Sequence, residues 1–398
     1  MGHLKYNILT NSCLLIFCIH LSCITLSTGN DQNYNKTISI SDNREIYKFY
    51  ENLGNKMTAI LAPILLIIGG VGNPLCIIIL LKGKRKNPTV IYLCILAFFD
   101  FLVLYTGLLR QYINETWNYD IRNFSNVFCK LHIFMTYTFM QISSYILVSV
   151  TLNRFTIIFN RTVFCKQKQI TSTRINEKDS NKSVYLIVFI ISVLVSLWNF
   201  PFLYFYDIIQ QPNKKNNYLS DCTIDKESNN EYYIFRTKYY GKLHLYIFIV
   251  VPCFILFVLN LLIIKKIMYS SKNLKLNNKE AKKKDKKRTA LSIMLVSVCL
   301  WFMILKTPAS LYLTFPVQEM SKPYFPLTYN LFMLVNYTNH AVNLILYIAT
   351  SSSFRNEVKK FLEHIICKNK KQNSINSSMK NNAMKRLGSH EENHELVE

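Results

Sequence analysis

Charged residues are almost absent from the interiors of seven long apolar stretches of this chain, although Asp, Glu, Lys and Arg make up 18% of its 398 residues. Away from the ends of the stretches, the charged residues are Asp100, Arg154 and Lys306. Each stretch holds the ~20 residues that a helix needs to cross ~30 Å of hydrocarbon. Because helices satisfy their own backbone hydrogen bonds in lipid, we predict an all-α membrane protein. The predicted spans are 57–81, 89–110, 130–157, 184–206, 240–267, 290–315 and 326–350.

The sequence also lacks the motifs of common enzymes. It has no metal-spaced set of His and Cys, no nucleophile motif and no Gly-rich phosphate loop, so we do not expect an enzyme. His132, His244 and His340 fall on separate spans, where packing or hydrogen bonding is the simplest interpretation. A transporter with seven spans is an alternative, because buried charges can line a transport path. The lack of an internal repeat argues against it.

Acidic residues are few, with 23 Asp and Glu against 47 Lys and Arg and a formal net charge of +24. A basic excess can indicate nucleic-acid binding, but no soluble domain is present to carry that function. Counted over the predicted loops and tail, 30 Lys and Arg lie on one side of the bundle and 13 on the other. The positive-inside rule therefore predicts an extracellular N-terminus and a cytoplasmic C-terminus in the plasma membrane.

The first 29 residues have the features of a secretory leader. A weakly positive start precedes an apolar run that is too short to span a bilayer, and small residues follow it. We predict a signal peptide at 1–29 and an extracellular N-terminus at 30–56, with an uncleaved anchor as the alternative. Sequons on the predicted outer side make Asn35, Asn114 and Asn123 candidate glycosylation sites.

The eleven cysteines sort by their predicted compartment. Three lie in the leader, four lie in spans, and two face the reducing cytosol. Cys129 and Cys222 remain on the oxidising side, so we predict that they form a disulfide. This bond would tie the loop 207–239 to the outer end of the third span.

Short motifs follow one another through the spans in a fixed order. Cys129 and Arg154 lie 25 residues apart, about 38 Å of helix, at opposite mouths of the third span. The motifs are Gly72-Asn73, Leu96-Ala97-Phe98-Phe99-Asp100, Asn153-Arg154-Phe155, Pro252, Phe302 with Pro308, and Asn343-Leu344-Ile345-Leu346-Tyr347. In this order the chain resembles the class A (rhodopsin-like) G protein-coupled receptors over residues 57–366. The resemblance implies a seven-transmembrane helix bundle at 57–350 that signals to a heterotrimeric G protein.

The resemblance also implies an activation switch at the cytosolic end of the bundle. In the family, the arginine matching Arg154 closes the cytosolic cavity at rest and meets the G protein when active, and the residues matching Asn343 and Tyr347 rearrange. Pro308 would supply a hinge for outward movement of the sixth helix, with a static bend as the alternative. Asn153 is neutral where the family has an acidic residue, and Lys286-Lys287-Arg288 is basic, so we expect ligand-independent activity. A snorkelling arginine is the other interpretation of Arg154.

A second group of residues matches the polar core that holds a sodium ion in many receptors of this class. A buried carboxylate at Asp100 needs a cation, a proton or several donors. The resemblance implies a site for an allosteric sodium ion at Asp100, with a protonated, merely structural Asp100 as the alternative. Lys306 stands where the family usually has a tryptophan. We expect its ammonium group to pair with Asp100, directly or through water, and to compete with sodium; a lysine that reaches the extracellular pocket is the alternative. The predicted polar core consists of Asn73, Asp100, Ser143, Asn339, Asn343 and Lys306.

The outer half of the third span restricts the ligand. Amine receptors of the family carry an aspartate at the position of Thr136, and opsins carry a lysine at the position of Tyr337, so both classes are excluded by the resemblance. The predicted pocket residues are Thr136, Tyr137, Met140, Gln141, Lys306 and Tyr337. Acidic loop residues would attract a basic ligand. Three stretches resemble invertebrate FMRFamide-type neuropeptide receptors, namely residues 89–101, 136–155 and 339–347. This resemblance implies a short amidated peptide as the ligand; a non-peptide small molecule is the alternative.

The segment after the seventh span has an apolar face and basic flanks. We predict an amphipathic eighth helix at 351–367 that lies in the membrane interface and ends at Cys367, a candidate palmitoylation site. The polar residues 368–398 are predicted to form a disordered cytoplasmic tail, whose serines are candidate sites for a receptor kinase and arrestin. The basic loop 269–289 is expected to contact anionic lipid and to flank the G-protein site.

Overall fold

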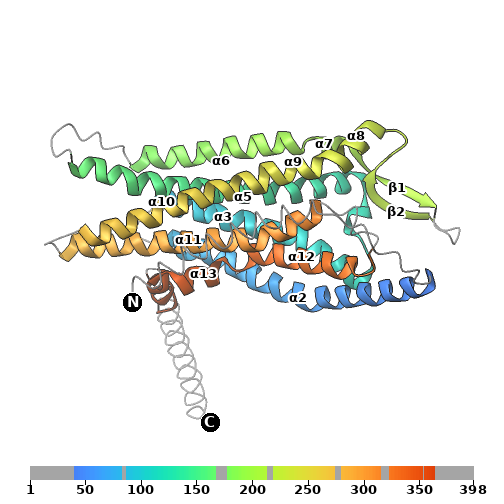
Figure 1. The fold of residues 1–398 in the computed structure, drawn as a ribbon, viewed down its shortest axis with the longest axis horizontal. Coiled ribbons are helices and arrows are strands. Elements are labelled where there is room, and N and C mark those ends of the chain that lie inside the picture. Colours follow the sequence, from blue (N-terminus) through green and yellow to red (C-terminus); the bar gives the residue numbers. More distant parts are fainter. Residues whose placement is uncertain are drawn as a thin grey trace, which may run out of the picture.

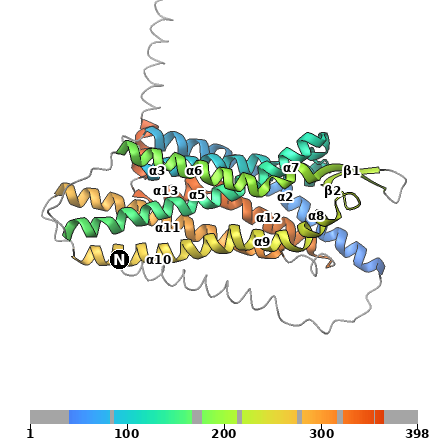
Figure 2. The ribbon, with the colours of Figure 1, turned by 90° about the horizontal axis from the view of Figure 1, so that it is seen from above.

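Long helices run side by side along the longest axis of the molecule, and a two-stranded sheet lies at one end (Figures 1 and 2). The computed structural model describes residues 40–82, 87–166, 177–212, 218–273, 279–314, 322–352 and 354–363. Within these residues, six helices are long and apolar enough to cross a membrane, and a bent helix pair brings the total to as many as seven. The predicted seven-helix bundle is therefore confirmed.

Most spans consist of more than one helical element. The elements of the described residues are α2 (Ile40–Lys82); α3 (Pro88–Val103), η1 (Leu104–Leu108) and α4 (Leu109–Trp117); η2 (Ile121–Phe124); α5 (Asn126–Lys166); α6 (Glu177–Asn199) and α7 (Pro201–Phe205); β1 (Tyr206–Pro212) and β2 (Tyr218–Ile224); α8 (Asn230–Phe235), η3 (Arg236–Tyr240), α9 (Gly241–Leu245), η4 (Tyr246–Val250) and α10 (Val251–Asn273); α11 (Lys279–Thr314); and α12 (Phe325–Ala341) and α13 (Asn343–Thr350). The helices extend beyond the apolar stretches from which they were predicted, because a helix satisfies its backbone hydrogen bonds in water as well as in lipid. The first begins at Ile40, so much of 30–56 is helical.

The helix α5 runs through the centre of the bundle and packs against α3, α6 and α10. The largest cluster of buried apolar side chains surrounds it, and includes Ile146, Leu147 and Val150 of α5 itself. By contrast α6, at the edge of the bundle in Figure 1, exposes Phe189, Leu194 and other large apolar residues. An exposed apolar helix face fits contact with lipid chains.

Short π-helical turns interrupt two of the spans next to α5. At η4 the N–H of Val251 bonds to the carbonyl of Tyr246 instead of that of Ile247. The hydroxyl of Tyr145 from α5 donates to the Ile247 carbonyl at 2.8 Å. At η1, Nε2 of His132 lies 2.9 Å from the carbonyl of Thr106. Polar side chains of α5 thus bind backbone groups of neighbouring helices where the regular helical pattern is interrupted.

The last span bends by 55° between α12 and α13. The residue at the bend is Val342, whose φ of −93° and ψ of 4° are not helical. No proline lies there, but Nδ2 of Asn73 from α2 donates to the carbonyl of His340 at 3.0 Å. A side chain that binds a helix carbonyl in this way produces a kink. We attribute the bend to this contact, and the bend brings the side chains before and after it toward the core.

The chain continues beyond α13 as a helix over residues 354–363. The hydroxyl of Ser351 accepts a hydrogen bond from the N–H of Phe354 at 3.2 Å, which is the usual cap of a helix N-terminus. Phe354 packs on Tyr347, and the ammonium group of Lys82 lies over the ring of Phe361 at 4.6 Å. Within its described part, the predicted eighth helix is therefore present and packs one face against the bundle.

Candidate functional site

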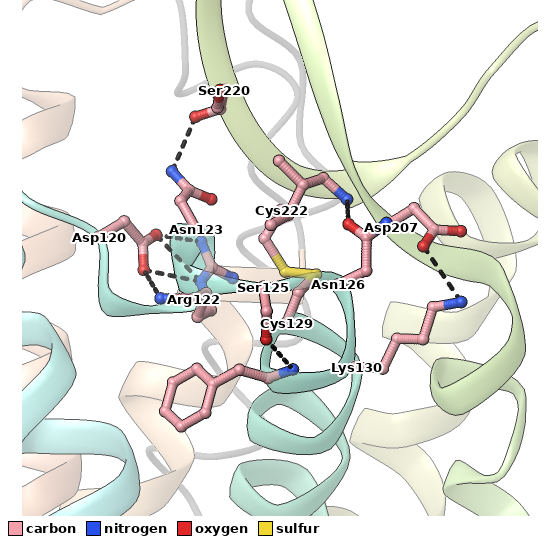
Figure 3. Close-up of a disulfide and its surroundings, with 12 residues drawn as sticks. Asp120, Arg122, Asn123, Ser125, Asn126, Cys129, Lys130, Asp207, Ser220 and Cys222 are labelled. Atoms are coloured by element: carbon pink, nitrogen blue, oxygen red, sulfur yellow. Dashed lines mark hydrogen bonds and ion pairs between the residues drawn. A yellow bond between two sulfur atoms is a disulfide. The ribbon is translucent and has the colours of Figure 1, made fainter.

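A disulfide closes one end of the bundle, which we call the hairpin end. Cys129 at the start of α5 bonds to Cys222 of β2, with a Cα–Cα distance of 5.7 Å, as predicted (Figure 3). The strands β1 and β2 form an antiparallel hairpin in which Cys222 pairs with Ile208. Asn126 Oδ1 accepts a hydrogen bond from the N–H of Ile208 at 3.0 Å, and Lys130 forms an ion pair with β1. These contacts hold the hairpin against α5.

Polar contacts fix the loop between α4 and α5 beside this disulfide. Asp120 forms ion pairs with Arg110 and, at 2.6 Å, with Arg122. Burial raises the pKa of Asp120, but hydrogen bonds and charge from the two arginines outweigh it and hold the pKa well below its usual value. Asn123, a predicted glycosylation site, donates from Nδ2 to the carbonyl of Ser220 at 2.7 Å (Figure 3).

An arginine lies among aromatic rings at the hairpin end, although it was not one of the predicted pocket residues. The guanidinium group of Arg236, in η3, is 4.4 Å from the ring centre of Tyr240 and 5.7 Å from that of Phe202. Its Nη2 donates to the hydroxyl of Tyr137 at 2.9 Å, and its Nε donates to that of Tyr206 at 3.3 Å. Among the described residues, no carboxylate forms an ion pair with it. We call these five residues the arginine cluster.

Two of the predicted pocket residues border the arginine cluster. Tyr137 belongs to the cluster itself. Gln141, one turn deeper, is buried and accepts a hydrogen bond from Asn199 Nδ2 at 2.6 Å. Asn199 also donates to Thr138 and lies 3.3 Å from the hydroxyl of Tyr240. Asn199 therefore joins α5, α6 and η3 into one polar network that includes Gln141.

Of the other predicted pocket residues, Met140 and Tyr337 lie at the contact between α5 and α12, Thr136 lies on α5, and Lys306 lies on α11. Met140 Sδ is 3.7 Å from Asn336 Nδ2 of α12. Tyr337 is buried against Gly107 of η1, where a Cβ atom would lie only 2.4 Å from its hydroxyl. This close approach requires glycine at position 107. Thr136 donates to the carbonyl of His132 on its own helix at 2.8 Å.

A buried carboxylate occupies the middle of the bundle. Asp100 of α3 accepts a hydrogen bond from Ser143 Oγ of α5 at 2.6 Å, and its Oδ1 lies 2.6 Å from His340 Nδ1 of α12. Its Oδ2 accepts from Asn343 Nδ2 of α13 at 2.5 Å. We call these four residues the aspartate cluster. Asp100, Ser143 and Asn343 are brought together as predicted, whereas His340 had been interpreted only as a packing or hydrogen-bonding residue.

The remaining predicted core residues surround the aspartate cluster without bonding to its carboxylate. Asn73 binds the His340 carbonyl, as described above. Asn339 is at the edge of the buried region, with 9% of its surface exposed. The ammonium group of Lys306 donates to Ser144 Oγ at 3.2 Å and lies 5.4 Å from the ring centre of Phe302. Among the described ion pairs, none joins Lys306 to Asp100, so the expected direct pairing is not seen.

Part of the predicted switch lies beyond the aspartate cluster, toward the end of the bundle opposite the hairpin: Asn153, Arg154, Phe155 and Tyr347. Arg154 is 5% exposed, and Asn153 Nδ2 donates to Thr89 Oγ1 of α3 at 2.8 Å. Phe155 stacks near Phe159 on α5. Tyr347 of α13 is fully buried. Phe302 is also buried, while Pro308, which lies inside the continuous helix α11, is exposed.

Some predicted features lie outside the described residues. They are the leader at 1–29, the glycosylation site Asn35, the palmitoylation site Cys367 and the tail at 368–398. The side chains of the basic residues Lys286-Lys287-Arg288 are likewise outside the described part. Asn114 is on α4 and half-buried, and its Nδ2 lies 3.1 Å from its neighbour Glu115.

Comparison with known proteins places this architecture in a family. The sequence profile described as "7 transmembrane receptor (rhodopsin family)" matches residues 72–347, which include the aspartate cluster, Cys129, Arg154 and Cys222. A search of curated proteins found no significant match.

Proposed function

This chain belongs to the rhodopsin family of seven-transmembrane receptors, and we propose that it is a plasma-membrane receptor for a short amidated neuropeptide. Membership of the family makes it a signalling receptor with a ligand and a G protein as partners. The proposal adds that the peptide binds at the hairpin end, and that outward movement of the sixth helix passes the signal to a heterotrimeric G protein. It also adds that the N-terminus is extracellular and the C-terminus cytoplasmic, from the distribution of Lys and Arg.

The arginine cluster is the observation that carries the peptide proposal. A guanidinium group with aromatic neighbours and no carboxylate partner among the described residues retains donors for the carbonyl oxygens of a peptide. The ring of Tyr137 is only partly buried and offers an edge or face for an aromatic side chain, whereas the buried rings of Phe202 and Tyr240 support the guanidinium group from below. Arg236 is only partly buried, so a ligand can reach it from the hairpin end.

Acidic residues surround the approach to the cluster and favour a peptide that also carries positive charge. Asp221, Glu227 and Glu231 are exposed on the hairpin and on the segment after it. Hydrogen bonds from Ser228 and from the Glu227 N–H lower the pKa of Asp225, so its carboxyl stays ionised at neutral pH. A negative rim attracts basic ligands and speeds their association.

The arrangement at the opposite end supports coupling to a G protein. Arg154 lies at the predicted cytosolic mouth of α5, and Tyr347 follows Asn343 of the aspartate cluster by one helical turn and is fully buried. The helix over 354–363 packs beside Tyr347 through Phe354. Movement of α11 about Pro308 would uncover Arg154. Arrestin and a receptor kinase are proposed as later partners, on the basis of the serines of the tail.

Cells that express the full chain together with a promiscuous G protein test the proposal directly. We expect an amidated short peptide from a peptide library to release calcium, with the free-acid form of the same peptide much weaker. The matched control is Lys238→Ala, an exposed cation near Arg236 in η3, which should respond normally. Responses only to non-peptide compounds would favour a small-molecule receptor, and substrate-dependent current without G-protein signalling would favour a transporter.

A further inference from the structure

The carboxylate of Asp100 receives three donors from the protein itself, and one of them is an imidazole. We propose that His340, and not a sodium ion, is the partner of Asp100, so that the polar core of this receptor does not respond to sodium. The inference concerns the aspartate cluster alone and does not depend on the identity of the ligand.

The geometry around Asp100 does not suit a sodium ion. Hard cations in proteins are bound by several oxygen atoms. Of the three groups on the carboxylate, the Ser143 hydroxyl is the only one that directs an oxygen atom toward it in this structure, and it acts as a donor. Asn343 directs its amide nitrogen to Oδ2, although rotation of the amide would present its oxygen instead. His340 has no side-chain oxygen in any orientation.

His340 is held in this position from both sides. Its side chain is fully buried, with 0% of its surface exposed. Its carbonyl is bound by Asn73 of α2, and its Nδ1 is 2.6 Å from Asp100 Oδ1. Moving the imidazole away would leave a buried carboxylate with fewer donors. The N–H of the imidazole therefore occupies the side of the carboxylate that a cation would need to reach.

The positive charge of a nearby lysine also makes the binding of sodium unfavourable. Lys306 of α11 donates to Ser144, the neighbour of Ser143, and its positive charge acts on both Asp100 and His340. The ionisable groups that act on His340 from the helices around it are thus Asp100 and Lys306. A positive charge this close disfavours the entry of another cation.

Thermal unfolding of the purified full-length receptor in sodium chloride and in choline chloride of equal concentration tests the inference. We expect the melting temperature of the unaltered receptor to be the same in both salts. Sodium should stabilise the His340→Ser variant, because serine offers an oxygen and leaves space beside the carboxylate. An ion present at tenfold its dissociation constant should raise the melting temperature by about 2 °C.

Two controls separate this site from general salt effects. The matched variant is His132→Ser, which changes another buried histidine of the bundle and should stay insensitive to sodium. The double variant Asp100→Asn with His340→Ser should lose the gained response, since the charge that binds the cation is gone.

The inference is overturned if sodium stabilises the unaltered receptor more than choline does, or if a folded His340→Ser variant shows no sodium response. If His340→Ser does not fold, His340→Asn provides the oxygen instead, and the measurement on the unaltered receptor still decides. Because melting requires neither ligand nor G protein, a failed peptide screen leaves this test intact, and a sodium response would not affect the peptide proposal.

Discussion

The arginine cluster and the aspartate cluster are built around opposite charges and in opposite ways. Arg236 is a partly buried cation held by aromatic rings and two phenol hydroxyls, and no described carboxylate pairs with it. Asp100 is a buried anion whose two oxygens receive donors from α5, α12 and α13. The arginine cluster can therefore form hydrogen bonds with a ligand, whereas the carboxylate of the aspartate cluster already receives its hydrogen bonds from the protein.

This difference separates recognition from switching. A cation that rests on π faces keeps much of its capacity for hydrogen bonds, so a peptide carbonyl can be added at low cost. A carboxylate that is fully bonded in a dry interior resists change, because each lost donor leaves a buried polar group without a partner. The hairpin end is therefore suited to binding, and the middle of the bundle to holding one of two arrangements of α12 and α13.

Removal of the Asp100 carboxylate should have the largest effect. Asp100→Ala leaves Ser143, His340 and Asn343 without their common acceptor, and we expect a loss of about 3–5 kcal/mol in stability. The measurement is the melting temperature of the purified receptor together with its amount at the cell surface, detected through an N-terminal epitope. Asp100→Asn, which keeps one acceptor oxygen, should lose less; equal stability of the alanine variant and the unaltered chain would contradict a tightly bonded cluster.

Loss of the disulfide should come next and should affect the hairpin end. Cys222→Ser frees β2 from α5, and we expect a cost of about 2–4 kcal/mol, with lower surface expression and weaker peptide responses. The control is Cys94→Ser, which alters a free buried thiol in α3. An unchanged melting temperature together with unchanged peptide potency in Cys222→Ser would contradict this expectation.

Replacement of Arg236 should weaken the ligand response with little effect on the core. Arg236→Met keeps the length and the apolar contacts of the side chain but removes the charge and its donors to Tyr137 and Tyr206. We expect at least a tenfold loss in the potency of the activating peptide, about 1.4 kcal/mol, measured as the concentration for half-maximal calcium release. Unchanged potency would remove Arg236 from the binding site, and the Lys238→Ala variant provides the matched comparison.

The smallest effect is expected at the predicted cytosolic mouth. Asn153→Asp places a carboxylate beside Arg154, while the Thr89 hydroxyl can donate to the new side chain. We expect ligand-independent signalling to fall about two- to fivefold, the range of a weak ion pair. Basal second-messenger level, normalised to surface receptor, is the measurement. Asn153→Ala adds no charge and should not lower it; the absence of any basal signal from the unaltered receptor would contradict the expectation.

Much of the site was predicted because its residues lie at the positions of the family's sequence motifs or in a compartment that limits their partners. Cys129 and Cys222 follow from compartment, and Asp100, Ser143 and Asn343 from register along their helices. His340 and Arg236 were not predicted as partners, although His340 is in the seventh predicted span and Arg236 lies just before the fifth. A histidine or arginine near a helix end has many ordinary explanations, and only the bend at Val342 and the π-helical turn at η3 direct these side chains to their neighbours.

The sequence by itself determined that seven helices cross the membrane, which residues form the disulfide and which charges are buried, because each follows from hydrophobic length, compartment or helical spacing. The tertiary structure alone decided how the buried charges are satisfied. Lys306 lies at Ser144 and not at Asp100, and His340 takes the carboxylate, since hydrogen-bond partners are chosen by distances among four helices that no stretch of sequence specifies.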